Sequence, residues 1–594
     1  MPPGRPITPS RYNARLKEAK AIAYRGASDM PISSVSAETT MVFPTGGWRS
    51  SRPEFLDKIP PCVVACPAGE NIGQSMVHVS AGRFDAALST LRADNPLLAT
   101  TGRVCFHPCQ NDCNRKIMEG AVNIQAIERF LGDRGLRTPF EVKAGASGKR
   151  VAVIGAGPAG LSFAHQALLA GFKAVVFERE DVPGGLLATG IPEYRLPKHI
   201  LFDEISLLEE AGLELRLGIN IGQDVTFDEI RKSFDAVFVA TGFHASESLD
   251  IPGVGASGVL SGLDFLRNVN AQHPPTIGRR TVVVGGGNTA MDAARSAMRL
   301  GSQVTIAYRR TQEMMPAIRE EIDEALDEGV RIAYLLSPVE VIVEGGAAAG
   351  LRCQRMSLAE PDESGRRRPV PVPNAYVSLD CNTVIFAIGE RPELSFLPKG
   401  WKIEETGEIS DADNNPVPGL IAGGDLTTVR KTVAHAIGSG KKAFAAVNAW
   451  LNGVTWEQAA GMVVTAPHSA GLTGMLADRP HSPAVASAEA INLNHFASIP
   501  PIKEKVSAGD AVLHGFQEVR DTYDEKSAVR EAERCFNCGV CNMCLKCFAY
   551  CPDSSIRIAE DGKSLDIDLA YCKGCGICAE ECPRGAIGMV WEEK

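Results

Sequence analysis

The chain has 594 residues, of which 44% are hydrophobic and 22% charged, with 61 basic and 71 acidic side chains and a formal net charge of -10. This composition is typical of a soluble, cytoplasmic protein of several domains, and a nucleic-acid-binding protein would normally carry a basic surplus. No apolar run reaches the roughly 18 residues of a membrane span, and residues 1–20 lack the apolar core of a secretory signal.

The cysteines are distributed unevenly. Of 17 cysteines, five lie in residues 62–113 and ten in residues 535–582, whereas Cys353 and Cys381 stand alone between these groups. Closely spaced cysteines in an intracellular chain are more often metal ligands than disulfides. We therefore expect metal-binding regions at both ends, and we interpret the two isolated cysteines as small buried hydrophobic residues.

A dinucleotide-binding motif opens the middle part of the chain. An apolar run at 151–154 leads into a glycine-rich turn and a helix, and a second run at 174–177 ends in an acidic residue. The glycines let the backbone approach a pyrophosphate at the helix N-terminus, and the acid bonds a ribose hydroxyl. The predicted binding residues are Gly155, Gly157, Pro158, Ala159, Gly160 and Glu178.

A second motif of the same kind follows the apolar run 281–284. Its predicted binding residues are Gly285, Gly287, Asn288 and Thr289. The next strand, 304–308, ends in Arg309 and Arg310 where the first motif has an acid. Arginine at this place can pair with the 2′-phosphate of NADP, and a solvated turn is the alternative interpretation. Two such motifs imply two dinucleotides, most simply a flavin and a nicotinamide.

Two cysteine runs near the C-terminus share the spacing C-x2-C-x2-C-x3-C-P, and the second begins 31 residues after the first (541 to 572). In bacterial ferredoxins with this pattern, three cysteines of a run hold one [4Fe-4S] cluster and the fourth holds the other. The predicted ligand sets are Cys541, Cys544, Cys547 and Cys582 for one cluster, and Cys572, Cys575, Cys578 and Cys551 for the other. Zinc is the alternative for C-x2-C pairs. Cys535 and Cys538, just upstream, stay unassigned between spare ligands, an extra partial site and loop cysteines.

Residues 60–455 resemble the small subunit of glutamate synthase and the N-terminal half of dihydropyrimidine dehydrogenase. The matching stretches are 102–113, 190–198, 240–242, 285–292, 308–310, 422–425 and 432–436. The resemblance implies an FAD domain interrupted by an inserted NAD(P) domain. It also implies that FAD is bound by Glu178, Gly185, Leu186, Arg195, Thr241, Gly242, Gly424, Asp425, Thr432, Val433 and Ala434.

The same resemblance implies an N-terminal cluster with a carboxylate ligand. The matching residues are Cys66, Cys105, Cys109 and Glu128. An ordinary surface carboxylate is the alternative interpretation of Glu128. The family usually carries two further cysteines upstream of Cys62, but residues 1–61 contain none. A second N-terminal cluster would retain only Cys62 and Cys113, which is half of a ligand set, so we expect one cluster here besides the two C-terminal ones.

The C-terminal part, from about residue 535, resembles the ferredoxin-like subunit of 2-oxoacid:ferredoxin oxidoreductases. Its fusion to a flavin and NAD(P) module resembles the flavoprotein subunit of 2-oxoacid oxidoreductase complexes such as phenylglyoxylate dehydrogenase. These resemblances imply an FAD enzyme that exchanges electrons between NAD(P)H and iron–sulfur clusters in a hetero-oligomeric complex. Its partner would be a catalytic oxidoreductase subunit or a soluble ferredoxin.

Two alternatives to this function stay open: an electron donor like the glutamate synthase small subunit, and a non-enzymatic electron-transfer or redox-sensing subunit. A disulfide reductase is disfavoured because residues 114–534 contain no C-x2-C. No catalytic acid or base is predicted, and we interpret His107 and His435 as structural.

The expected fold class is α/β, with two Rossmann-like domains, an N-terminal helical iron–sulfur domain and a C-terminal ferredoxin-like α+β domain. The expected limits are 1–60 for an N-terminal arm, 61–145 for the helical domain, 146–270 and 376–455 for the discontinuous FAD domain, 271–375 for the NAD(P) domain, 456–530 for a linker and 531–594 for the ferredoxin domain.

Overall fold

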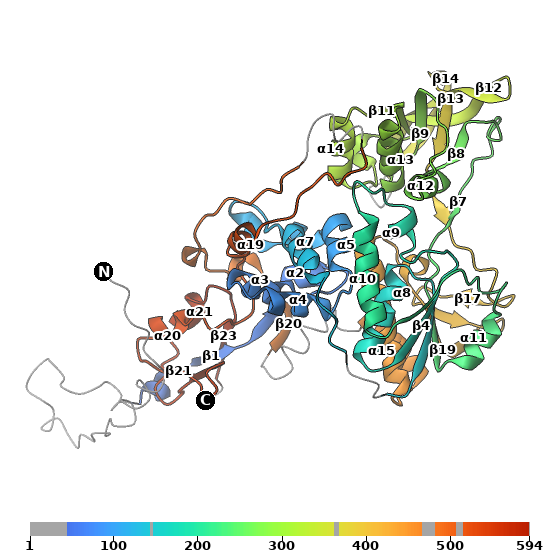
Figure 1. Ribbon diagram of the computed structural model, residues 1–594. Coiled ribbons are helices and arrows are strands. Elements are labelled where there is room, and N and C mark those ends of the chain that lie inside the picture. The colour runs from blue at the N-terminus through green and yellow to red at the C-terminus, as the bar shows by residue number, and fades with distance from the viewer. Residues whose placement is uncertain (1–43, 143–146, 362–366, 466–480, 507–514, 593–594) are drawn as a thin grey trace, which may run out of the picture.

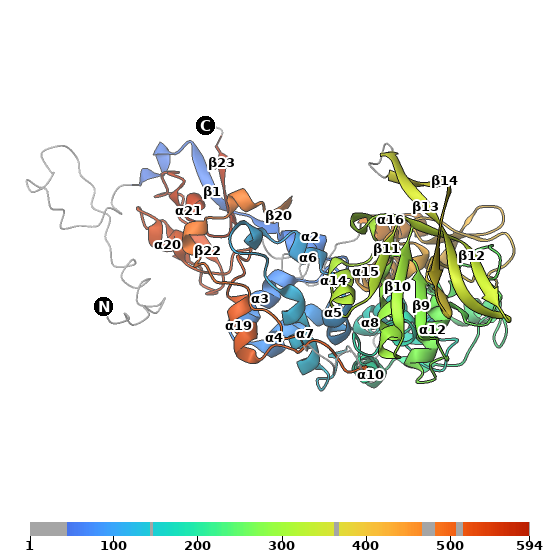
Figure 2. The same cartoon turned by 90° about the horizontal axis from the view of Figure 1, so that it is seen from above.

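The computed structural model describes residues 44–142, 147–361, 367–465, 481–506 and 515–592. The ferredoxin-like part lies at one end, short helices lie in the middle, and two sheets lie at the other end (Figure 1). Figure 2 shows the same order from above. Among the described residues, no helix is long and apolar enough to cross a membrane.

The middle part is a group of short helices. They are α2 (Pro61–Ala65), α3 (Ile72–Ser80), α4 (Phe84–Arg92), α5 (Leu98–Val104), α6 (Pro108–Asn111) and α7 (Ile124–Gly135), with η4 (Asn114–Ile117) between the last two. Helices α5 and α7 pack closely because each has a glycine at the contact. A Cβ on Gly102 would lie 2.4 Å from the Cα of Arg129, and one on Gly132 would lie 2.3 Å from the nitrogen of Ala99. This packing brings the cysteine after α5 next to α7.

The first sheet has seven strands in the order β17-β18-β19-β6-β3-β4-β5. Its strands are β3 (Arg150–Ile154), β4 (Lys173–Phe177), β5 (Glu214–Arg216), β6 (Ala236–Val239), β17 (Lys402–Ile403), β18 (Glu408–Ser410) and β19 (Pro416–Ala422). The strands β19, β6, β3, β4 and β5 are parallel. Its helices are α8 (Pro158–Leu169), α9 (Leu186–Thr189), α10 (Lys198–Glu210), α11 (Phe227–Ser233) and α15 (Val433–Leu451), with η6 (Gly424–Leu426).

The second sheet is parallel, in the order β11-β10-β9-β15-β8. Its strands are β8 (Val259–Ser261), β9 (Arg280–Val284), β10 (Gln303–Tyr308), β11 (Arg331–Tyr334) and β15 (Thr383–Phe386), and its helices are α12 (Gly262–Asn270), α13 (Asn288–Arg299) and α14 (Arg319–Asp327), with η5 (Gln312–Met314). Three antiparallel strands adjoin it: β12 (Leu336–Glu344), β13 (Ala347–Pro361) and β14 (Arg367–Asp380). The chain passes between the sheets through the paired β7 (Ala245–Ser246) and β16 (Glu390–Arg391).

This sheet extends beyond the limits 271–375 expected for the NAD(P) domain. Strand β15 pairs with β9 on one side and with β8 on the other, so β8 and β15 belong to the same sheet as β9. The expected limits were too narrow because β8 and β15 are only three and four residues long, and such short apolar runs carry no clear periodicity.

The ferredoxin-like end contains two segments that were expected to be an arm and a linker. Strand β1 (Ser51–Phe55) pairs with β23 (Ile587–Trp591), and β2 (Asp57–Ile59) pairs with β20 (His481–Val485). The expectation of an arm was therefore wrong for residues 51–59, because an edge strand gains its hydrogen bonds from partners hundreds of residues away. Residues 1–43 lie outside the described part.

The remaining helices and strands are short and lie near the two ends of the chain or just after α15. They are η3 (Thr45–Trp48), α16 (Trp456–Thr465), η7 (Ala488–Ala490), η8 (Leu493–His495), α19 (Glu525–Ala532), α20 (Lys546–Tyr550), α21 (Ile577–Glu580), β21 (Ile556–Ile558) and β22 (Leu565–Ile567). Helix α19 begins at Asp524, whose side chain accepts a hydrogen bond from the backbone of Ser527. It packs on α3 and α7, so the C-terminal part returns to the middle of the molecule (Figure 1).

Candidate functional site

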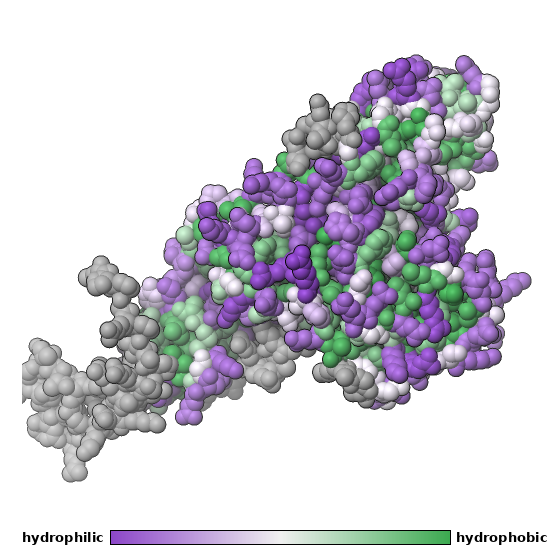
Figure 3. All heavy atoms as spheres, viewed as in Figure 1, coloured by the Kyte–Doolittle hydropathy of each residue, from purple (hydrophilic) through white to green (hydrophobic). Residues whose placement is uncertain are grey.

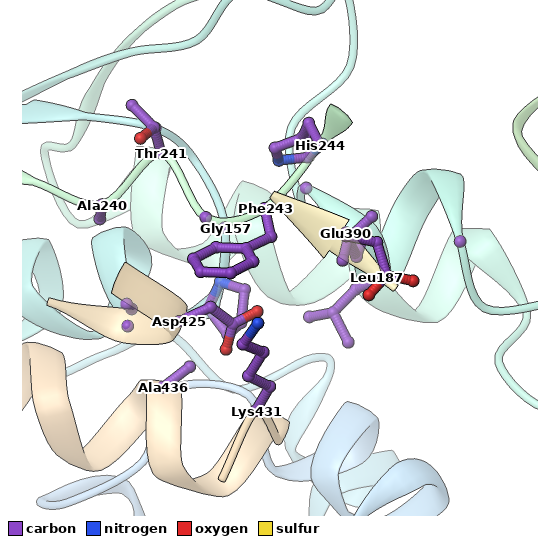
Figure 4. A pocket seen from close by; sticks show the side chains of 18 of the residues that line it. Gly157, Leu187, Ala240, Thr241, Phe243, His244, Glu390, Asp425, Lys431 and Ala436 are labelled. Atoms are coloured by element: carbon purple, nitrogen blue, oxygen red, sulfur yellow. The ribbon is translucent and has the colours of Figure 1, made fainter. Parts of the chain in front are cut away.

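One cavity of about 1240 Å³ lies between the two sheets and is lined by both glycine-rich motifs. Figure 4 shows side chains around it that come from the segment after β6, from β16 and from α15. Pockets for drug-sized ligands are commonly about 300–1,000 Å³, so this volume suits a larger, extended molecule. Most residues predicted to bind a dinucleotide line it. Those that do not are Gly160, Gly285, Arg309, Arg310 and Ala434.

The first glycine-rich turn has the shape that a dinucleotide-binding motif requires. Gly155 has a φ of +108°, and a Cβ there would lie 2.5 Å from the oxygen of Ala240. A Cβ on Gly160 would lie 2.0 Å from the oxygen of Gly155, so this glycine serves helix–strand packing instead of lining the cavity. Gly157, in contrast, has open space in front of it. The turn can therefore bring its backbone close to a pyrophosphate.

Glu178 lies on the cavity wall at the end of β4. Its Oε2 accepts a hydrogen bond from the nitrogen of Ala156 at 2.7 Å, and its Oε1 accepts one from Glu180 at 3.0 Å. Each oxygen of a carboxylate has two lone pairs, so both keep one for a ribose hydroxyl. Nearby, Thr241 also lines the cavity, and its buried hydroxyl has no partner in the described part of the chain. These residues fit an FAD molecule, as the resemblance implies.

Asp425, in η6, also lines the cavity. Burial raises its pKa to about 6, and the charge of Lys431 opposes this rise. The amine of Lys431 lies 3.4 Å from the centre of the Phe243 ring, and Figure 4 shows the three side chains together. A buried carboxylate of this kind gains from a hydrogen-bond donor such as a ribityl hydroxyl.

Arg195 lines the cavity but is engaged with the second sheet's helices. Its Nη1 donates to both oxygens of Asp292 at 2.8 and 2.9 Å, and its Nε lies 2.9 Å from Glu321. These neighbours raise its pKa further above the ordinary value, against the effect of burial. Arg195 thus ties the first unit to α13 and α14. Its role as an FAD contact stays a prediction.

The second motif contributes Gly287, Asn288 and Thr289 to the cavity wall. Gly287 has open space in front of it, which leaves room for a second dinucleotide. Arg309 and Arg310 follow β10 and do not line this cavity. Arg309 is exposed, whereas Arg310 is half-buried and its Nε has no partner among the described residues.

The predicted N-terminal cluster site, Cys66, Cys105, Cys109 and Glu128, lies at helices α5, α6 and α7 and at the end of α2. Burial, and then repulsion from Cys66 and Cys105, raises the pKa of Cys109 well above its ordinary value. Glu128 is 7% exposed, so it is not the surface carboxylate of the alternative interpretation. Its Oε1 accepts a hydrogen bond from Thr101.

A second buried carboxylate, Glu70, lies beside this site and was not predicted. Its Oε1 accepts a hydrogen bond from Asn95 at 2.7 Å, and burial raises its pKa to about 7. Sequence reasoning had no signal for Glu70 beyond its position four residues after Cys66. The site also adjoins the cavity, because Val104 and Phe106, on either side of Cys105, line the cavity wall.

The structure brings together each of the two C-terminal ligand sets. Burial raises the pKa of Cys547, and repulsion from three neighbouring thiolates, Cys541, Cys582 and Cys544, raises it further. A second, smaller cavity is lined by Cys551, Cys572, Cys575 and Cys578. In both sets the last cysteine of one run joins three of the other, as expected for a two-cluster ferredoxin. We name these sets the first and the second ferredoxin site.

The three sets share donor atoms that suit iron–sulfur clusters. Within the described ranges, no group of three or more His, Cys, Asp or Glu residues is placed to hold one metal ion. An iron–sulfur cubane holds its thiolates farther apart than a single zinc ion does. The donor sets, soft thiolates with one carboxylate, fit [4Fe-4S] clusters.

Comparisons with known protein families match three parts of the chain. Residues 149–440 match the pyridine nucleotide-disulphide oxidoreductase family. Residues 57–139 match dihydropyrimidine dehydrogenase domain II, 4Fe-4S cluster, and residues 565–588 match the 4Fe-4S binding domain. These matches confirm the predicted combination of an FAD and NAD(P) fold with iron–sulfur regions at both ends.

Three curated proteins are similar over most of their length. The beta subunit of NADP(+)-dependent formate dehydrogenase from Moorella thermoacetica is 37% identical over 520 residues, 80% of this chain and 70% of the relative. The beta subunit of NADPH-Fe(3+) oxidoreductase from Geobacter sulfurreducens is 34% identical, over 82% of this chain and 76% of the relative. The small chain of glutamate synthase [NADPH] from Escherichia coli K12 is 34% identical, over 66% of this chain and 89% of the relative.

Proposed function

Because this chain belongs to the family of FAD- and iron–sulfur-dependent NAD(P)H oxidoreductase subunits that includes the glutamate synthase small chain, we propose that it serves the catalytic subunit of a hetero-oligomeric complex. The proposed partner is a 2-oxoacid:acceptor oxidoreductase. The observation that carries the proposal is the shared cavity: both dinucleotide motifs line it, and the N-terminal cluster site adjoins it.

This arrangement suits an enzyme that converts a two-electron transfer from a nicotinamide into one-electron transfers to clusters. A nicotinamide gives two electrons as a hydride, each cluster takes one, and a bound flavin supplies the chemistry that connects them. The residues of both motifs line the same cavity, so they would hold the two dinucleotides next to each other. Arg195 fixes α13 to the first unit through its ion pairs with Asp292 and Glu321, so the two halves of the cavity keep their relative position.

The N-terminus of α15 is the part of the wall that can support a reduced flavin. Thr432 caps the helix by accepting a hydrogen bond from the nitrogen of His435, and Val433 lines the cavity. The positive end of the helix dipole favours negative charge there. Burial lowers the pKa of His435, whose ring stacks on Phe106 with 6.0 Å between centroids, so this histidine is neutral at pH 7. No side chain has to move a proton for the hydride step.

Exposed apolar side chains support a partner at the ferredoxin-like end. Trp48 and Trp591 are 74% and 79% exposed, and Tyr550 and Ile577 nearby are also exposed. Apolar residues gather on the visible face of this end (Figure 3). Exposed aromatic residues in such numbers are typical of protein–protein interfaces. A formate dehydrogenase catalytic subunit is the second candidate partner, because the Moorella relative is named as a subunit of that enzyme.

Anaerobic stopped-flow spectroscopy tests the enzyme function. We expect NADPH or NADH to bleach the flavin absorbance within seconds. In Gly287→Val the new side chain enters the open space at the second motif, so dithionite should still reduce the flavin while the nicotinamide no longer does. Gly255→Val, at an exposed glycine with no atom in its way, is the matched control and should behave as the wild type. If neither nicotinamide bleaches the wild-type flavin, the non-enzymatic alternative stands.

Affinity purification from native extract tests the partner. We expect the chain to co-purify with a catalytic oxidoreductase subunit. A monomeric chain that is fully active with a small-molecule oxidant as its only acceptor contradicts the subunit function.

A further inference from the structure

Four cysteines that the three predicted cluster sites do not use lie together where the ferredoxin-like part meets the helices. Cys62 lies in α2, Cys113 follows α6, and Cys535 and Cys538 follow α19. Burial, and then repulsion from Cys535, Cys113 and Cys538, raises the pKa of Cys62 well above its ordinary value. Burial and repulsion from Cys538 and Cys113 likewise raise the pKa of Cys535 to about 12. Two segments more than 400 residues apart in sequence thus form one buried group of thiols.

Buried polar contacts hold the second segment in this place. Arg534, which is fully buried, donates hydrogen bonds to the oxygens of Gly120 at 2.6 Å and Ala121 at 2.9 Å. Its neighbour Glu531 accepts a hydrogen bond from the nitrogen of Asn123 at 2.7 Å. The backbone just before Cys535 is therefore fixed against the chain just after Cys113.

Direct contacts reach the sulfur atoms themselves. The Nδ2 of Asn114 donates to the Sγ of Cys538 at 3.5 Å, which ties the neighbour of Cys113 to the other segment. The nitrogen of Asn537 donates to the Sγ of Cys535 at 3.4 Å. Arg584 brings a positive charge that stabilises the thiolates of both cysteines. N–H···S hydrogen bonds and a nearby cation are the surroundings that a cluster with thiolate ligands needs.

We propose that Cys62, Cys113, Cys535 and Cys538 bind a fourth [4Fe-4S] cluster, which we name the bridging site. It adds one cluster to the three that the sequence predicts. The half ligand set of Cys62 and Cys113 is completed by the C-terminal segment and not by cysteines upstream.

The position of the bridging site favours iron–sulfur over zinc, which four thiolates could also bind. Cys62 and Cys113 are each four residues from a ligand of the N-terminal cluster site, Cys66 and Cys109. Cys538 is three residues from Cys541 of the first ferredoxin site, at most about 11 Å between Cα atoms even when fully extended. The bridging site therefore lies between two electron carriers. A [4Fe-4S] cluster held by these four cysteines would supply one-electron chemistry between its two neighbours, whereas zinc would not change its charge.

Iron analysis of the anaerobically purified full-length protein tests the proposal without any nicotinamide. We expect about sixteen irons and sixteen acid-labile sulfides per chain, against about twelve for three clusters. Cys62→Ala/Cys113→Ala and Cys535→Ala/Cys538→Ala should each lose about four irons and the same EPR signal of the dithionite-reduced protein. The quadruple variant should lose the same four and not eight. Cys353→Ala/Cys381→Ala, which removes two buried cysteines outside all sites, should keep every iron.

Asn114→Leu separates ligation from folding. It leaves all four thiols in place and removes the N–H···S bond to Cys538, together with the hydrogen bond to the oxygen of Ala486 at 3.1 Å. We therefore expect a full iron content and a shift in the EPR spectrum or reduction potential of one cluster. Four results would each overturn the proposal. The first is an iron content of about twelve in the wild type, and the second is one zinc per chain that both double variants lose. The third is a set of iron losses that add in the quadruple variant, and the fourth is an unchanged spectrum of Asn114→Leu.

Discussion

The side chains of Tyr194 and Arg195, in the first dinucleotide-binding unit, contact charged side chains of the second unit. The guanidinium groups of Arg295 and Arg299 lie 4.7 and 3.8 Å from the centre of the Tyr194 ring. Arg295 also forms ion pairs with Glu321, which Arg195 contacts from the other unit. Charges buried in such a network stay favourable only while every partner is present. The network therefore acts as a rigid joint between the units and not as a set of independent pairs.

A pH-dependent contribution to stability is expected from Glu204 in α10. Its two carboxylate oxygens accept hydrogen bonds from the nitrogens of Ala99 at 2.6 Å and Thr100 at 3.0 Å, in the first turn of α5. Burial nevertheless raises its pKa from 4.5 to about 7. The folded protein therefore holds this proton more tightly than the unfolded chain does, so the contribution is full below pH 4.5 and is lost as the pH rises through about 7.

Glu204→Gln should remove this dependence. The shift corresponds to about 3 kcal/mol at most between pH 4.5 and 8. We expect the thermal midpoint of the wild type, measured by scanning calorimetry at pH 5 and pH 8, to fall more between the two values than that of Glu204→Gln. Glu210→Gln, at an exposed position of the same helix, is the control and should follow the wild type. Equal pH dependence in wild type and Glu204→Gln would show that Glu204 is ionised throughout.

At the scale of elements, the C-terminal end of β10 is the place where nicotinamide specificity is expected. Arg309 and Arg310 follow the strand, and the buried Nε of Arg310 has no partner in the described chain. A charged hydrogen bond to a 2′-phosphate is worth about 1.5–3 kcal/mol, or roughly 10- to 100-fold in affinity. We expect Arg310→Ala to lower kcat/KM for NADPH by this factor and to leave kcat/KM for NADH nearly unchanged.

The control for this comparison is Arg331→Ala. Arg331 is an exposed arginine at the beginning of the neighbouring strand β11, level with Thr305 and so away from the end of β10. Arg331→Ala should leave kcat/KM for NADPH and kcat/KM for NADH unchanged. If the NADPH to NADH ratio is the same in wild type, Arg309→Ala and Arg310→Ala, the arginines have no role at the phosphate and the solvated-turn interpretation holds.

At the scale of the whole molecule, the sites follow one another along its length. The shared cavity lies between the sheets, and the N-terminal cluster site adjoins it. The ferredoxin sites lie in the ferredoxin-like part, which is at the far end of the molecule (Figure 1). The bridging site joins the middle of the molecule to this end. Strand β1 reinforces the same connection, because it pairs with β23 and its Pro53 lines the cavity of the second ferredoxin site.

A reductive titration measures how many electrons the flavin and the clusters of one chain accept in total. FAD accepts two electrons and each [4Fe-4S] cluster one, so the fully loaded chain should take up about six equivalents. Coulometric titration with a low-potential mediator under argon gives the number directly. We expect about five equivalents for Cys535→Ala/Cys538→Ala. Five equivalents in the wild type itself would mean that only three clusters are present.

Much of the fold and of the candidate site could be predicted from short stretches of sequence. The turn from Gly155 to Gly160, and the cysteine runs from Cys541 and Cys572, each need a backbone shape that a few neighbouring residues specify. Their spacing therefore indicated the α/β fold, the two dinucleotides and the ferredoxin sites. Ligand sets and binding residues named from spacing alone, Arg195 among them, stay predictions.

The amino-acid sequence by itself determined the local motifs, because the geometry of one turn or one strand is set by adjacent residues. Only the tertiary structure decided which distant segments meet. It placed Cys535 and Cys538 beside Cys62 and Cys113, Glu70 beside Glu128, and residues 51–55 on the last strand of the chain. These long-range contacts depend on how helices and strands pack and on the closure of loops of hundreds of residues. The spacing of residues within a short motif carries no information about them.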